Sequence, residues 1–329
     1  MNTFGRNFRI TSFGESHGAA VGVIIDGCPA GMNLTTQDIQ PLLDRRRPGT
    51  SLLTSSRNER DRAEILSGIF EGETTGAPIA LMVRNEHQNP KDYEEIREKF
   101  RPGHADFTYE VKYGIRDFRG GGRSSGRETI ARVAAGAVAT KYLSRHSITI
   151  TGKILRVHGK TNPDEIEREI LSAKEAGDSV GGIVEITAAG CPPGIGDPVF
   201  GKLDALIAGA MMGIGAVKGV EIGDGFSVSG KFGSENNDQM TREGFLSNHA
   251  GGILGGITTG QDIIVRIAVK PTPSITRIQQ TRDIHGNTVE ISVGGRHDPC
   301  IVPRIIPVAE AMLALVLVDC MLEQEKRMK

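Results

Sequence analysis

The sequence has no tryptophan, few aromatic residues and no surplus of either charge. Aromatic residues make up 5% of the 329 positions, and 39 basic side chains stand against 40 acidic ones, for a formal net charge of −1. A nucleic-acid-binding domain is usually strongly basic. The balance therefore argues against a nucleic-acid partner. Arginines gather locally instead, which favours a compact anionic ligand.

Cysteine and long apolar runs are also scarce. Four cysteines lie far apart and match no zinc spacing: Cys28, Cys191, Cys300 and Cys320. We expect buried thiols in a reducing cytosol and no metal site. No N-terminal segment has the form of a signal peptide. The longest apolar run, 308–318, contains Glu310 and is too short to cross a bilayer. These absences predict a cytoplasmic protein without a membrane partner.

Glycine is abundant, with 43 residues, nearly double the usual share of roughly 7%. The segment 118–127 combines three consecutive glycines, two serines and three arginines, and it runs into a small-residue helix pattern over 128–143. Glycine lets backbone N–H groups approach an anion, and a helix N-terminus directs them toward it. Arginine adds bidentate donors for phosphate and carboxylate. The segment predicts a site for a phosphorylated small molecule, with a plain glycine-rich connection as the alternative.

This segment is not a nucleotide-binding Walker A loop. Gly121 and Gly126 have the right separation, but Arg127 and Glu128 stand where lysine and serine or threonine belong. The interpretation as a ligand site therefore depends on the other motifs of the chain.

Hydrophobic periodicity predicts a mixture of strands and helices. Expected strands cover 21–26, 79–83, 148–157, 182–188 and 263–269. Expected helices follow Thr35 and Thr36, cover 128–143, 163–177 and 203–212, and run from Pro307 to about Glu325, with a surface helix and lid-like loop over 85–101. Because the elements do not alternate regularly, we expect an α+β fold, and because no polar linker divides the chain, a single domain over 1–329.

Titratable residues lie on three separate glycine turns. His17 stands in 14–18, His104 in 101–106 and Asp298 in 294–299. Histidine is the usual proton donor near neutral pH. Two further turns, 247–256 and 270–274, are suited to a cofactor phosphate. Taken singly, each of these last segments fits a structural turn about as well.

Together these blocks resemble chorismate synthases. The match rests on six motifs in the right order along nearly the whole chain: 14–29, 44–50, 100–106, 121–129, 247–252 and 295–311. The resemblance implies a β-α-β sandwich with helices layered between antiparallel sheets, usually in a homotetramer. It also implies loss of phosphate and the 6-pro-R hydrogen from 5-enolpyruvylshikimate 3-phosphate, in an anti 1,4-elimination that gives chorismate and needs reduced FMN. Chorismate is the last common intermediate of the shikimate pathway to aromatic amino acids, so the implied enzyme is a carbon–oxygen lyase.

The resemblance also implies roles for individual residues. His17 would donate a proton near the leaving phosphate, His104 would protonate or hydrogen-bond the reduced flavin, and Asp298 would relay the C6 proton that flavin N5 accepts. The implied substrate ligands are Ser16, Arg45, Arg46, Arg101, Ser125 and Arg127, joined by Arg296 as a further anion ligand. The implied FMN ligands are Arg123, Ser124, Ser125, Gly215, Ala216, Gly255, Lys270, Pro271, Thr272, Pro273, Ser274 and Arg296.

The chain departs from the family pattern at two positions. Gly215 replaces an asparagine of many bacterial members, and Leu52 replaces an arginine assigned to NADPH contact in some relatives. Only Arg46 remains for that contact, so NADPH is expected only as a source of reductant. Nothing resembles a flavin reductase domain, and we expect reduced flavin from an external reductase.

Two other hypotheses stay open from the residues alone. A phosphohydrolase would use the same arginines and histidines, release phosphate without FMN and leave a hydroxylated ring. A non-catalytic binder of a phospho-metabolite or flavin would keep its function after alanine replaces His17, His104 and Asp298. Three titratable groups on separate turns argue against simple binding.

Overall fold

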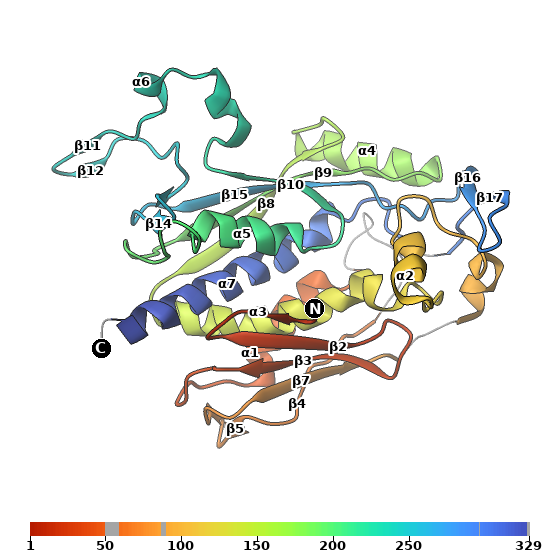
Figure 1. Cartoon of the computed structure of the whole chain (residues 1–329), viewed down its shortest axis with the longest axis horizontal. Helices are drawn as coiled ribbons and strands as arrows, with labels where there is room; N and C mark the ends of the chain where they lie inside the picture. The colour runs from red at the N-terminus through yellow and green to blue at the C-terminus, as the bar shows by residue number, and fades with distance from the viewer. Residues whose placement is uncertain (50–58, 87–89, 296, 328–329) are drawn as a thin grey trace.

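Two antiparallel sheets enclose a layer of helices in the computed structural model (Figure 1). The structure describes residues 1–49, 59–86, 90–295 and 297–327. The first sheet has the order β1 (Thr3–Phe4), β2 (Arg9–Gly14), β3 (Ala20–Asp26), β7 (Ile79–Arg84) and β4 (Glu64–Ile65). The second has the order β10 (Val217–Ile222), β15 (Ile263–Val269), β9 (Gly182–Ala189) and β8 (Thr149–Val157). This arrangement confirms the expected α+β sandwich.

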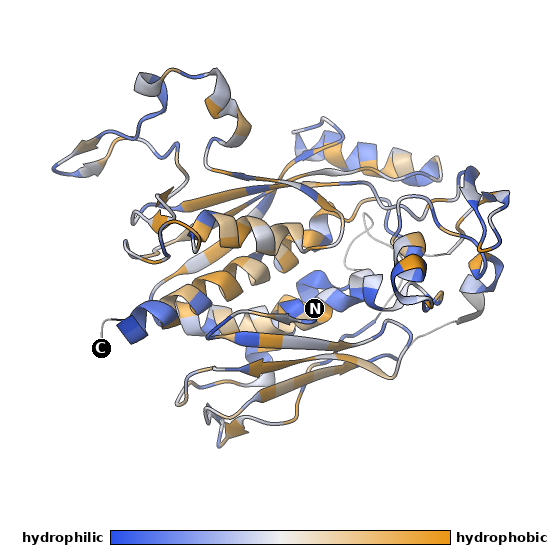
Figure 2. Cartoon of the chain, in the orientation of Figure 1, coloured by the Kyte–Doolittle hydropathy of each residue, from blue (hydrophilic) through white to orange (hydrophobic). Residues whose placement is uncertain are grey.

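Four helices form the middle layer: α1 (Thr36–Arg46), α3 (Thr129–Ser144), α5 (Leu203–Met212) and α7 (Val302–Arg327). Helix α3 contacts α1, α7 and strands β3 and β7, while α7 contacts α5, β8 and β9. The largest hydrophobic cluster therefore runs from the first sheet through the helices to the second. Figure 2 shows apolar residues concentrated on this layer and a hydrophilic C-terminal end of α7.

Helix α7 is apolar on all sides because other elements surround it. In the described part of the chain it is the one helix long and apolar enough to span a membrane, and 89% of its most apolar window is buried within the fold. Burial on every face explains an all-round apolar helix in a protein core.

The smaller elements lie at the edges of these layers. Helix α4 (Pro163–Glu175) covers the outer face of the second sheet (Figure 1). The segment carrying η4 (Gly225–Gly230), α6 (Gly233–Asn236), β11 (Met240–Thr241) and β12 (Gly244–Phe245) extends away from the layers. The remaining elements are β5 (Ile69–Phe70), β6 (Glu73–Thr74), α2 (Asp106–Tyr113), η2 (Gly122–Ser124), η3 (Gly126–Glu128), β13 (Ile253–Leu254), β14 (Ile257–Thr258), β16 (Gln279–Arg282) and β17 (Thr288–Ile291).

Two expected elements need correction. The last helix begins at Val302, five residues before Pro307, because Pro303 occupies the first turn, where a missing N–H costs nothing. The amides of Arg304 and Ile305 both donate to the Ile301 carbonyl at 3.0 Å, which starts the helix there. Of the range 85–101, expected to hold a surface helix and a lid-like loop, residues 87–89 lie outside the described part of the chain. The described rest carries only the short 3₁₀ helix η1 (Pro90–Ile96).

The middle layer depends on close approach of α3 and α7. A Cβ atom added at Gly136 would lie 2.2 Å from the Ala311 Cβ and 2.6 Å from its Cα. Only glycine at this crossing lets the two backbones reach this separation, so α3 and α7 pack face to face.

We expect Gly136→Ala to lower the free energy of unfolding by about 1–3 kcal/mol, because the added methyl forces α3 and α7 apart. The matched control is Gly209→Ala in α5, where a Cβ meets nothing within 4 Å. The control should gain up to about 1 kcal/mol from helix propensity. Urea unfolding of both variants checks the prediction, and equal gains would contradict the close crossing.

Candidate active site

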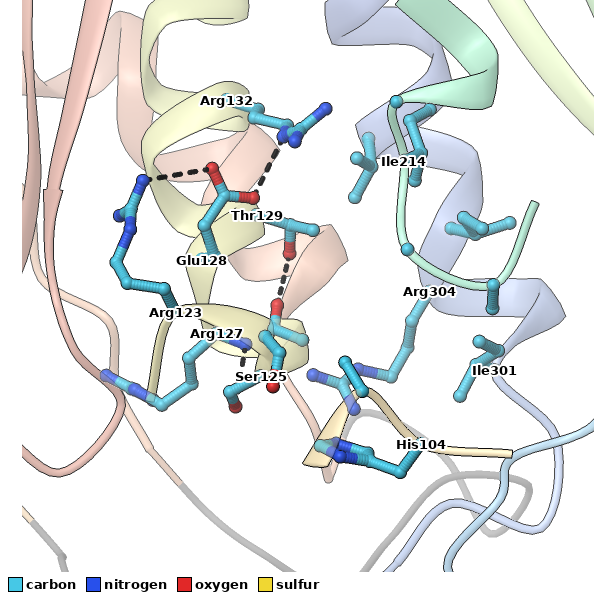
Figure 3. Close-up of a pocket in the computed structure, with 18 of the residues that line it drawn as sticks. His104, Arg123, Ser125, Arg127, Glu128, Thr129, Arg132, Ile214, Ile301 and Arg304 are labelled. Carbon is cyan, nitrogen blue, oxygen red and sulfur yellow. Dashed lines mark hydrogen bonds and ion pairs between the residues drawn. The ribbon is translucent and has the colours of Figure 1, made fainter. Parts of the chain in front are cut away.

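One cavity of about 760 Å³ lies where α1 ends, α3 and α7 begin and the segments after α5 and β15 meet (Figure 3). Cationic side chains dominate its lining: Arg46, Arg101, Arg123, Arg127, Arg132, Lys270 and Arg304. The acidic side chains of the lining are Glu128 and Asp298. Seven cations against two acids, in a chain of net charge −1, favour a multiply anionic ligand.

The glycine-rich segment forms the turns η2 and η3 that lead into α3. Gly120 and Gly121 adopt φ angles of 68° and 89°, in the left-handed region. A Cβ at Gly120 would stand 2.5 Å from the His17 ring, and one at Gly121 would stand 2.7 Å from the His104 ring. The glycines therefore let the backbone pass directly beside both histidines.

Where η2 and η3 lead into α3, the cavity wall carries a row of alternating charges (Figure 3). Glu128 accepts from Arg132 at 2.9 Å and lies 3.9 Å from Arg123. Arg123 also donates to the Ser12 hydroxyl at 2.7 Å and to the Gly14 carbonyl at 3.2 Å. The contacts of Arg123 tie η2 to strand β2 and hold its side chain at the cavity.

Arg46 and Arg127 are buried side by side around one carboxylate. The side chain of Arg46 is 1% exposed and that of Arg127 is 6% exposed. Asp61 pairs with Arg46 Nη2 at 2.5 Å and with Arg127 Nη1 at 3.1 Å. Glu59 also pairs with Arg127 Nη1, and Asn85 accepts from Arg127 Nε at 3.0 Å. Sequence reasoning missed both acids, because they stand in a charged stretch, 59–64, without a motif.

His104, Arg101 and Asp106 form a hydrogen-bonded group at the cavity. Asp106 accepts from Arg101 Nε at 2.7 Å and Nη2 at 2.8 Å, and its Oδ1 lies 2.8 Å from His104 Nδ1. Because a carboxylate only accepts, Nδ1 donates to Asp106, and Nε2 of the neutral ring is left as the acceptor. Arg101 Nη2 lies 3.1 Å from the same Nδ1. Because Nδ1 carries the proton it cannot accept from Arg101, and Nη2 donates to Asp106 instead.

Burial and pairing set the protonation of this group. Burial lowers the pKa of His104 below its ordinary value, and the hydrogen bond to Asp106 offsets this only in part. Burial would raise the pKa of Asp106, but the hydrogen bonds from Arg101 and His104 hold it well below its usual range. A neutral imidazole beside an ionised carboxylate follows.

His17 and Ser16 lie one layer behind the cavity wall. Both are buried, and the Ser16 hydroxyl is 3.0 Å from His17 Nδ1. The His17 ring packs edge-on against Tyr93, which lines the cavity, with centroids 5.1 Å apart. Gly120 lines the cavity and lies directly beside the His17 ring, which does not line the cavity itself.

Asp298 lines the opposite wall and forms an ion pair with Arg304. Arg304 also donates from Nε to the Arg46 carbonyl at 3.0 Å, so α7 is tied to the end of α1. Neither Arg304 nor the cavity-lining His297 was expected individually. Burial lowers the pKa of His297. One feature of the sequence could have identified Arg304 as a partner of Asp298: it stands six residues later, at the start of an apolar helix.

Of the two turns suited to a cofactor phosphate, 270–274 lines the cavity and 247–256 does not. Lys270, Thr272, Pro273 and Ser274 lie beside Gly215 and Ala216, and the Lys270 amide donates to the Ala216 carbonyl at 2.9 Å. The buried Thr272 hydroxyl has no hydrogen-bond partner within the described residues. A Cβ at Gly215 would meet nothing within 4 Å, so the departure from asparagine leaves open space.

Other residues expected at the site lie elsewhere, and Arg45 is the clearest case. Arg45 points away from the cavity and pairs with Glu310 at 2.8 and 2.9 Å. Consecutive helix residues are rotated by about 100°, so Arg45 and Arg46 cannot face the same cavity. Gly255, in the β13–β14 turn, and Pro271 also do not line it. Arg296 and Leu52 lie outside the described residues, whereas Ser124 and Ser125 line the cavity.

Comparison with known proteins extends over nearly the whole chain. The family model described as chorismate synthase matches residues 8–322. The chain is 54% identical to the chorismate synthase of Syntrophobacter fumaroxidans (strain DSM 10017 / MPOB), over 98% of this chain and 97% of the relative. It is 53% identical to that of Syntrophus aciditrophicus (strain SB), over 98% of both. A crystal structure of chorismate synthase matches with a TM-score of 0.77 at 34% identity, covering 98% of this chain and 93% of the other. The chain belongs to the chorismate synthase family.

Proposed function

We propose that the protein converts 5-enolpyruvylshikimate 3-phosphate to chorismate, in an elimination that requires reduced FMN. The C3–O bond to phosphate breaks, the C6 pro-R hydrogen leaves as a proton, and a second ring double bond forms. Family membership supports this reaction. The observation that carries it is the cavity in which seven cationic side chains meet His104 and Asp298.

The charge of the substrate explains the cationic lining. The substrate carries two carboxylates and a phosphate, and the leaving phosphate gains charge as the C–O bond breaks. Preorganised guanidinium groups stabilise that charge better than water does, because they need no reorientation. Arg46, Arg101 and Arg127 are buried and anchored by carboxylates, so they are the proposed anion ligands.

The cavity also fits a phosphorylated flavin. Reduced FMN, when bound, supplies electron density to the allylic system as the phosphate leaves. Lys270, the partnerless hydroxyl of Thr272 and the open space at Gly215 would hold it, with Ser124 and Arg123 on the facing wall. We propose that an external reductase supplies it in reduced form, that NADPH serves only as the source of reductant, and that the active protein is a cytoplasmic homotetramer.

The titratable residues have distinct proposed tasks. Neutral His104 offers Nε2 as a hydrogen-bond acceptor to the cofactor, with its tautomer held by Asp106. His17 is the proposed proton donor to the departing phosphate, and it lies directly behind Gly120, which lines the cavity. Asp298, held by Arg304, accepts and passes on the C6 proton.

We expect anaerobic incubation of the protein with 5-enolpyruvylshikimate 3-phosphate and dithionite-reduced FMN to give chorismate and phosphate in equal amounts. Ultraviolet absorbance follows chorismate, and a phosphate assay runs on the same samples. Oxidised FMN should give neither product. Phosphate without chorismate would instead indicate a hydrolase. Binding of FMN with neither product would leave only a binding protein.

We expect His104→Ala to lower kcat by about 10²-fold or more, because a positioned proton-transfer group contributes on that scale. The matched control is His146→Ala, since His146 is exposed and packs on Tyr142 away from the cavity. Steady-state kinetics at saturating reduced FMN measure both variants. Turnover near the wild-type value in His104→Ala would remove this residue from the mechanism.

We expect stability to fall as the pH drops below about 6.5, the value for unfolded histidine. His104 and His297 have lowered pKa values in the folded protein, so the unfolded chain takes up protons first as the pH falls. Urea unfolding at pH 7 and at pH 5 should show a smaller loss of unfolding free energy in His104→Ala than in wild type.

Imidazole NMR should show the His104 pKa falling further in Asp106→Asn, because the hydrogen bond to Asp106 raises that pKa. A rise would contradict Asp106 as the partner of His104.

A further inference from the structure

We propose that Asp61 is a positioning residue that sets the spacing of Arg46 and Arg127 for anion binding. This inference rests on the proposed function, because it assigns the two arginines to the anionic substrate. Asp61 does not line the cavity, whereas both arginines do. It therefore acts through them.

The bridge joins two elements that are far apart in the sequence. Arg46 ends α1, and Arg127 lies in η3, just before α3. The Asp61 side chain is fully buried. Its Oδ2 accepts a hydrogen bond from Arg46 Nη2 at 2.5 Å, and its Oδ1 forms an ion pair with Arg127 Nη1 at 3.1 Å without a hydrogen bond. Two buried like charges repel and lose hydration, and a carboxylate shared between them offsets part of both costs. Without Asp61, the guanidinium groups of Arg46 and Arg127 would lose the partner that they share.

The backbone of Asp61 is itself held in an unusual conformation. Its φ angle is 43°, in the left-handed region that non-glycine residues seldom adopt. Gln40 of α1 donates from Nε2 to the Asp61 carbonyl at 3.2 Å and accepts at Oε1 from the Ala63 amide at 3.0 Å. Such strain persists only where the surrounding structure imposes it. The helix that carries Arg46 thus also anchors its partner.

The bridge leaves a donor of Arg46 for a ligand. Arg46 Nη1 has only long contacts, 3.4 Å to the Gly126 carbonyl and 3.4 Å to the Thr129 hydroxyl. Its buried Nε has no hydrogen-bond partner within the described residues. Asp61 thus orients Arg46 from one side without saturating it. A counterion that merely competed with the ligand would have the opposite effect on binding, so the two roles can be separated.

The test is Asp61→Asn, which keeps the size of the side chain and removes its charge. We expect kcat/KM for 5-enolpyruvylshikimate 3-phosphate with reduced FMN to fall at least about tenfold, because small displacements of binding groups cost that much or more. Inorganic phosphate should also stabilise the variant less against heating than it stabilises wild type. That second readout needs no turnover, so a wild-type protein that makes no chorismate would refute the proposed function and leave the Asp61 role testable.

The matched control is Glu185→Gln. Glu185 is a buried carboxylate that bridges Lys153 at 2.9 Å and Arg266 at 2.8 Å in the second sheet, outside the cavity. It should lose stability but keep kcat/KM within about twofold of wild type. If Asp61→Asn does not fold, Gln40→Ala decides the question, since it loosens the Asp61 turn without changing charge, and kcat/KM should then fall at least about threefold.

Two results would overturn the proposal. A lower KM with unchanged kcat in Asp61→Asn would show a competing counterion. Unchanged kinetics together with an unchanged phosphate effect, in Asp61→Asn or in a folded Gln40→Ala, would show that Asp61 only stabilises the fold.

Discussion

The cavity depends on keeping guanidinium groups out of bulk water without neutralising all of them. A buried arginine without a partner is costly, and a fully saturated one cannot bind a ligand. The structure meets both demands with acids placed behind or beside the arginines. Asp61 lies behind Arg46 and Arg127, and Asp106 holds Arg101. Arg304 in turn pairs with Asp298.

The layered helices make this arrangement possible. Arginines of α1, η3 and α7 meet at the cavity, and α3, which follows η3, packs closely against α7 at Gly136 and also contacts α1. Arg304 connects α7 to the last turn of α1 through the Arg46 carbonyl. The elements that carry the charged groups are thus held together by the packing of the middle layer.

The sequence predicts local structure and motif chemistry better than it predicts partners. Strands such as 263–269 and the helix over 203–212 are correct because their periodicity is local. The glycine-rich segment also predicts a ligand site without reference to the fold. The role expected of Arg45 needs correction, because adjacent arginines in a motif look equivalent until a helix rotates them apart.

Partners that are distant in sequence could not be predicted in this way. Asp61 meets Arg127 across 66 positions, and no pattern in 59–64 marks it as different from a solvated charged turn. Its left-handed backbone and the hydrogen bond that its carbonyl accepts from Gln40 exist only in the folded chain. The proposed roles of His17, His104 and Asp298 came from family motifs, whereas Asp61 and Arg304 emerge from geometry alone.

The two histidines differ in what their surroundings permit. His104 touches both a guanidinium and a carboxylate, and burial keeps the ring neutral, so it is suited to hydrogen bonding at neutral pH. His17 has the neutral hydroxyl of Ser16 and the edge of Tyr93 beside it, with Gly120 between the ring and the cavity. In the proposed reaction, a proton donor to the departing phosphate must be reachable by an anion but shielded from bulk water. Gly120 leaves room for the His17 ring next to the cavity lining, and a side chain at position 120 would displace the ring.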